Sequence, residues 1–144
     1  AETNEKYVPY CIEPSMGVER IFLMTAMEAY DVEQLENDTR IVMHFSPKLA
    51  PYLAAVLPLA KDQRELAKEI HAKLAKRFTV TYDETASIGK RYRRQDAIGT
   101  PFCITVDFDT PNDNAVTVRD RDTMKQERIA IDKLGDYLEE KYGE

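Results

Sequence analysis

A cluster of positive charge at residues 90 to 94 stands out in an otherwise acidic chain. Four of its five positions are cationic: Lys90, Arg91, Arg93 and Arg94. Such side chains bind phosphate groups, and arginine can also donate hydrogen bonds to the edges of bases. The 144 residues together carry a formal net charge of -6. Any contact with nucleic acid therefore has to come from a local patch, because the chain as a whole does not attract polyanions.

The spacing of these cations favours one helix face. On a helix, Lys90, Arg93 and Arg94 stand at positions i, i+3 and i+4 and point the same way. A solvated face with balanced charge is the alternative, because acidic residues lie nearby. These acids are Asp83, Glu84 and Asp96.

A second charged segment, "RDRDTMKQER", spans residues 119 to 128. It interleaves Arg119, Arg121, Lys125 and Arg128 with Asp120, Asp122 and Glu127. One interpretation is a surface turn whose exposed ion pairs stabilise little. The other is recognition of bases, since arginine and aspartate pair with the edges of guanine and cytosine. The sequence leaves both open.

A third group of residues has spacing suited to ATP chemistry. In "EPSMGVER", residues 13 to 20, an acid and a hydroxyl precede a glycine, and an arginine follows within the first turn of a predicted helix. This order would place a cation-binding acid next to an anion-binding helix N-terminus. Ordinary helix capping produces the same pattern.

The elements predicted before residue 48 are a strand over 7–12 and a helix over 18–30. The helix is apolar on nearly every side, which predicts burial on every side. We expect Met24 and Met27 of this helix, together with Met16, to fill a core. Residues 31–40 are polar and acidic, as in a linker or an exposed loop.

The second part of the chain alternates strands and helices. Strands are predicted over 52–59, 78–83, 101–108, 114–120 and 126–131, and helices over 62–77, 87–99 and 132–143. This order predicts an α/β fold over residues 48–144. Its sheet would be mixed, mostly parallel and of about five strands, with helices on both faces.

Cysteine and histidine usage predicts no metal site and no nucleophile. Cys11 and Cys103 each lie in an apolar stretch without a partner at ligand spacing, so reduced core residues of a cytoplasmic protein are expected. His44 and His71 are interpreted as structural. No window approaches 18 consecutive apolar residues, and the N-terminus does not resemble a signal peptide.

Several blocks of the sequence resemble glycyl-tRNA synthetases. They are "VPYCIEPSMGVER", "AAVLPL", "YDETASIGKRYRRQDAIGTPFCITVDFDT" and "VTVRDRDTMKQERIAI". The first is similar to the third signature motif of class II aminoacyl-tRNA synthetases. Because the blocks run in the expected order through most of the chain, the resemblance is more specific than any single motif.

The resemblance implies a C-terminal fragment with three parts. Residues 1–31 would be the edge of a class II catalytic domain, 32–47 a linker, and 48–144 an anticodon-binding domain. The neighbours of the apolar helix would then belong to a catalytic sheet outside this chain. In such an enzyme Arg20 would hold the ATP triphosphate, Glu13 would face ATP and Mg²⁺, and Ser15 would lie at the glycine pocket.

The first two class II motifs are absent, so we expect the fragment alone to be inactive and to need no cofactor. The parent would be a cytoplasmic homodimer that ligates glycine to tRNA(Gly) with ATP and Mg²⁺. The residues expected at the anticodon are Lys90, Arg91, Arg93, Arg94, Arg119, Arg121 and Arg128.

Two alternatives to this interpretation are less consistent with the sequence. A stand-alone synthetase-like module, of the kind found in polymerase accessory subunits, is disfavoured because it has no physical reason to keep Glu13 and Arg20 together. An unrelated doubly wound small-molecule binder is disfavoured because no glycine-rich phosphate loop follows the first strand.

Overall fold

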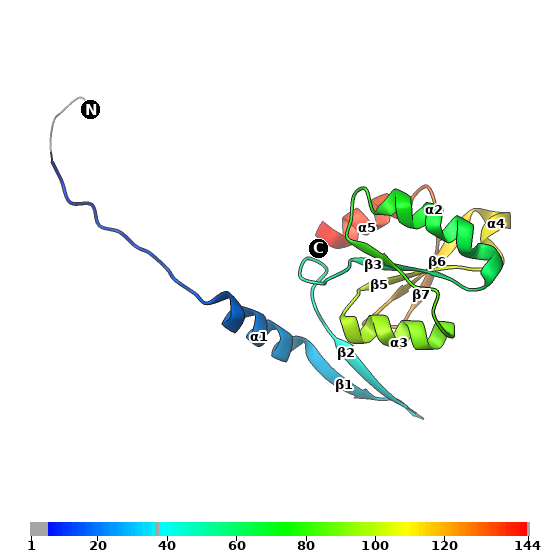
Figure 1. Ribbon diagram of the computed structural model, residues 1–144, viewed down its shortest axis with the longest axis horizontal. Coiled ribbons are helices and arrows are strands. Elements are labelled where there is room, and N and C mark those ends of the chain that lie inside the picture. Colours follow the sequence, from blue (N-terminus) through cyan, green and yellow to red (C-terminus); the bar gives the residue numbers. More distant parts are fainter. Residues whose placement is uncertain (1–5, 37, 144) are drawn as a thin grey trace.

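The computed structural model of the chain describes residues 6–36 and 38–143. Its main body is a five-stranded sheet with strand order β4-β3-β5-β6-β7 (Figure 1). The strands are β3 (Ala54–Pro58), β4 (Val80–Tyr82), β5 (Phe102–Val106), β6 (Ala115–Asp120) and β7 (Gln126–Ala130). The expected mixed α/β sheet is confirmed.

The sheet is not mostly parallel as expected, because parallel and antiparallel pairings are evenly divided in it. β3 is parallel to both β4 and β5, whereas β6 is antiparallel to β5 and β7 to β6. The connections explain the difference. Helices link β3 to β4 and β4 to β5, as parallel neighbours require, and short connections join the last three strands.

Helices cover both faces of the sheet, as predicted. One face carries α2 (Arg64–Leu74), which follows the short helix η1 (Lys61–Gln63), and α5 (Leu134–Gly143). The other carries α3 (Ile88–Ile98), on the opposite side in Figure 1. α4 (Thr110–Asp113) is a single turn between β5 and β6.

The two central strands supply apolar side chains to both layers. Every residue of β3 and β5 is buried, which is why each reads as a continuous apolar run. Ala54 and Val56 pack in the same cluster as residues of α2 and α5. Ala55 and Leu57 face the other way, toward Ile88 and Tyr92 of α3.

The expectation of an exposed loop over 31–40 is wrong. α1 (Val18–Ala29) leads directly into β1 (Tyr30–Gln34), which pairs antiparallel with β2 (Thr39–Met43). The polar composition hid the alternation in β2, where Arg40 and Val42 are buried and their neighbours Thr39 and Ile41 are exposed. The buried side chains hold the hairpin against the body of the fold.

Three expectations for the N-terminal part are also wrong. Residues 7–12 form no strand, and Cys11 is exposed, whereas Cys103 is buried in β5. Burial raises the pKa of the Cys103 thiol to about 12, which keeps it protonated. Met16, Met24 and Met27 are exposed rather than in a core, because no described residue covers them.

The other side chains of α1 are also largely exposed to solvent. Phe22 is 70% exposed, and Ala29 is the only buried residue of this helix. Among the described residues, no helix combines the length and apolar character needed to cross a bilayer.

Candidate nucleic-acid interface

The carboxyl ends of the parallel strands form one edge of the sheet, which we call the carboxyl edge. β3 ends at Pro58, β4 is followed by Asp83, and β5 by Asp107. α3 begins next to this edge, since the backbone N–H of Asp83 bonds to β3 and Arg94 pairs with the Asp83 carboxylate. Ligands of open α/β sheets commonly bind at such an edge.

Three of the four clustered cations are accessible at or near this edge. Lys90 is exposed and forms no ion pair with any described residue. Arg94 is 43% exposed in its side chain and pairs with Asp83. Arg93 is 37% exposed and pairs with Asp38 of the hairpin at 2.8 Å. The shared face expected from the spacing of these three residues is therefore open to solvent.

Arg91 does not belong to that face. Only 4% of it is exposed, and its Nη1 donates to the Pro58 carbonyl oxygen at 2.6 Å. It lies three residues after Ile88 and next to Tyr92, both of which pack on the sheet side of α3. Arg91 thus binds the last carbonyl group of β3. The expectation that it meets RNA is corrected, because its side chain is buried.

The second charged segment is divided between two places. Arg119 and Arg121 are only 6% and 3% exposed. Arg119 bonds to Asp96, and Arg121 donates to the Gly99 carbonyl oxygen at 2.8 Å, near the amino end of β5. Both guanidinium groups hold the fold together, so the expectation that they meet RNA is corrected as well.

Arg128 lies at the carboxyl edge, where it is paired. Its guanidinium bonds to Asp107 and to Asp113, with one third of the side chain exposed. Burial tends to raise the pKa of Asp107, but hydrogen bonds from Arg128, Thr117 and Thr110 outweigh it and lower that pKa. This part of the segment matches the self-paired surface interpretation.

Acid is therefore expected to weaken the Asp107 network. Because the folded pKa is lowered, the stabilisation is present above the unfolded value of about 3.9 and is lost as the pH falls through the folded value. Asp107→Asn should cost on the order of 1 kcal/mol at neutral pH. Thermal melts from pH 7 to 3 should show this deficit shrinking in acid, whereas exposed Asp132→Asn should show no such trend. A deficit that is constant across the range would contradict the assignment.

Sequence reasoning missed Phe108 as a candidate for base stacking. It falls inside the predicted strand 101–108, but β5 ends at Val106 and Phe108 is 62% exposed. The two aspartates that flank it were the available signal, since a buried strand does not continue through them. An exposed ring after the carboxyl end of β5 can stack on an unpaired base.

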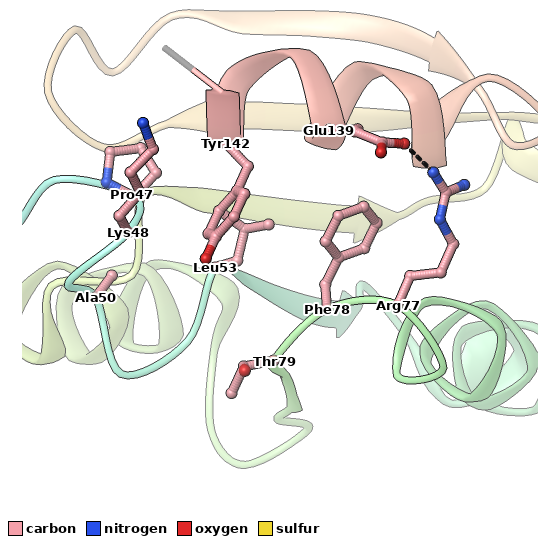
Figure 2. Close-up of a pocket in the computed structure, with 9 residues that line it drawn as sticks. All are labelled: Pro47, Lys48, Ala50, Leu53, Arg77, Phe78, Thr79, Glu139 and Tyr142. Carbon is pink, nitrogen blue, oxygen red and sulfur yellow. Dashed lines mark hydrogen bonds and ion pairs between the residues drawn. The ribbon is translucent and has the colours of Figure 1, made fainter. Parts of the chain in front are cut away.

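The opposite edge of the sheet holds a cavity of about 300 Å³. Figure 2 shows its lining, with Leu53 and Thr79 just before β3 and β4. Both cations there are engaged, since Arg77 pairs with Glu139 and Lys48 donates to the Gly143 carbonyl oxygen. Of these two cations, only Arg77 is neutralised by a carboxylate of the described residues, because the partner of Lys48 is an uncharged carbonyl oxygen.

The residues expected at an ATP site form no enclosed site within the described chain. Glu13 and Ser15 lie in an exposed segment without helix or strand, and Arg20 is exposed in the first turn of α1. Whether they hold ATP and Mg²⁺ stays a prediction. Among the described residues, Asp31, Glu33 and His44 have metal-ligand spacing. Ion pairing between the imidazole and the carboxylates also accounts for that group.

The profile of the family described as "Anticodon binding domain" matches residues 53–141. The chain belongs to this family. It is also 63% identical over 140 residues to the glycine–tRNA ligase of Bacillus anthracis, covering 97% of this chain and 31% of that protein. The ligase of Clostridium acetobutylicum is 61% identical, with 96% and 30% covered. The resemblance to glycyl-tRNA synthetases is confirmed, and the chain spans about a third of the length of these curated relatives.

Solved structures support the same fold for the anticodon-binding domain. The RNA binding domain of threonyl-tRNA synthetase from Cryptosporidium parvum Iowa II matches with a TM-score of 0.63 and 27% identity, covering 67% of this chain and 25% of that one. Histidyl-tRNA synthetase from Nostoc sp. PCC 7120 matches with a TM-score of 0.60 at 17% identity, covering 62% and 22%. The second likeness concerns the fold alone.

Proposed function

We propose that residues 48–144 bind the anticodon stem and loop of tRNA(Gly), as part of a ligase that joins glycine to this tRNA. The observation that carries the proposal is the carboxyl edge. In a chain of net charge -6, the edge and the adjoining face of α3 present Lys90, Arg93 and Arg94 to solvent. The stand-alone module without ligase activity is not favoured, since the relatives are glycine–tRNA ligases.

The chemistry of this edge suits a phosphate backbone with unpaired bases. The N-cap residue of α3, Ser87, makes no side-chain capping bond, and the first turn contains no acid. The backbone amide groups of this first turn and the Lys90 side chain are therefore available to a phosphate. Phe108 offers a stacking surface, and Arg128 can exchange an aspartate for a base edge.

The remaining roles extend the proposal to the parent protein. Residues 1–31 would belong to its catalytic domain, with Glu13, Ser15 and Arg20 serving ATP, Mg²⁺ and glycine, and 32–47 would join that domain to the anticodon-binding domain. Large apolar residues of α1 face solvent, which supports the proposal that another domain of the parent protein covers this helix. We further propose that the parent acts as a homodimer in the cytoplasm.

A fluorescence titration with a tRNA(Gly) anticodon stem-loop tests the binding site. The double variant Arg93→Ala/Arg94→Ala should weaken binding about tenfold and reduce the slope of log affinity against log salt by about two, because two phosphate contacts are lost. The control is Lys73→Ala/Lys76→Ala, which removes two exposed cations at the end of α2 on the other face. Equal affinities for the two double variants would contradict the proposed interface.

A further inference from the structure

Arg40 is a fully buried charged side chain that joins the hairpin to the body of the fold. It lies in β2 with none of its surface exposed. Its Nε donates to Asp96 of α3 at 2.9 Å, its Nη1 to Glu33 of β1 at 2.7 Å, and its Nη2 to the Arg121 carbonyl oxygen. One guanidinium thus connects three elements.

The electrostatics of the group favour a charged Arg40. Burial opposes the charge, but hydrogen bonds to Asp96 and Glu33 and the negative charge of both carboxylates raise its pKa. Asp96 also accepts from Arg119 of β6, at 2.8 Å to Nη1. Charge-assisted bonds of this kind have strict directions, so they specify one orientation of the groups that they join.

The orientation of the hairpin determines that of α1. α1 ends at Ala29 and β1 begins at Tyr30, so no loop separates them. A second contact holds the base of the hairpin, where His44 Nδ1 lies 2.6 Å from Asp122 Oδ1. A rotation of the hairpin on α3 would therefore carry the segment with Arg20 along with it.

We propose that Arg40 is a positioning residue that holds this segment at one orientation relative to the RNA-binding edge. The inference rests on the proposed function, because a ligase must present the far end of the bound tRNA to its catalytic domain. Formation of glycyl-adenylate needs no tRNA and should not depend on Arg40. Transfer of glycine to tRNA should depend on it.

The first test measures orientation in the chain itself. Spin labels at Glu28→Cys in α1 and Lys76→Cys after α2, in a Cys11→Ser background, report the distance between the two parts by pulsed electron resonance. We expect a narrow distribution, a broad one in Arg40→Met, and an intermediate one in Glu33→Gln, which leaves the Asp96–Arg119 pair intact. Thr39→Ala, an exposed neighbour on the same strand, is the control and should match the parent. Unchanged distributions in Arg40→Met and Glu33→Gln would overturn the proposal.

The second test uses a full-length glycine–tRNA ligase that carries this segment. In Glu33→Gln and Arg40→Met, kcat/KM for aminoacylation should fall about tenfold or more, while ATP–pyrophosphate exchange stays within about twofold. Equal losses in both reactions, or no loss in aminoacylation, would overturn the positioning role. Failure of the unsubstituted chain to bind the stem-loop would instead refute the proposed function and leave the distance result standing.

Discussion

Replacing Gly99 with alanine is expected to lower the free energy of unfolding by about 2–4 kcal/mol, through left-handed strain and overpacking together. Gly99 ends α3 with φ of +91°, a conformation that costs an L-residue energy. A Cβ there would lie 2.6 Å from Phe45 Cδ2 and 2.9 Å from the Met43 carbonyl oxygen. Because the second contact is backbone, the hairpin itself would have to move.

Gly89 provides a matched control within the same helix. A Cβ at Gly89 would meet no atom within 4 Å, and the residue lies in the first turn of α3. Gly89→Ala should leave stability unchanged or raise it by up to about 1 kcal/mol, since alanine is the better helix former. Urea unfolding of the two variants measures the difference. Equal stability would show that the end of α3 does not constrain the hairpin.

The parts of the fold that could be predicted from sequence are those that local periodicity determines. The continuous apolar runs of β3 and β5 and the four-residue spacing along α2 require no knowledge of distant partners. The hairpin was missed because its burial depends on distant groups. Arg40 can be buried because distant groups accept its hydrogen bonds. They are Asp96, 56 positions away, and the Arg121 carbonyl oxygen, 81 positions away.

The same difference between local spacing and distant partners explains which residues of the candidate site could be predicted. Helical spacing was enough to place Lys90, Arg93 and Arg94 on one open face. It did not identify Arg91 as inward, since the acceptor is a backbone oxygen at Pro58 in another element. Arg119 and Arg121 alternate with aspartates, which is typical of a surface turn, but Arg119 bonds to Asp96 of α3 and Arg121 donates to the Gly99 carbonyl oxygen that follows α3.

Asp96→Ala is expected to cost about 3–5 kcal/mol, because it leaves two buried guanidinium groups without the carboxylate between them. Asp96 is fully buried and accepts from Arg40 through Oδ2 and from Arg119 through both oxygens. Asp96→Asn preserves the shape but removes the charge and presents an amide donor toward two donors, so it should recover little of the loss. Urea unfolding of both variants provides the measurement.

An exposed ion pair between the same two elements is the control for Asp96. Asp38 of the hairpin turn pairs with Arg93 of α3, and both side chains are more than one third exposed. Asp38→Asn should therefore cost less than about 1 kcal/mol. The loss at Asp96 should also shrink when Arg40 is already methionine, because one of the two stranded cations is then absent. Losses at Asp96 and Asp38 of similar size, or a loss at Asp96 that does not depend on Arg40, would mean that apolar packing rather than this buried charge network holds the hairpin on α3.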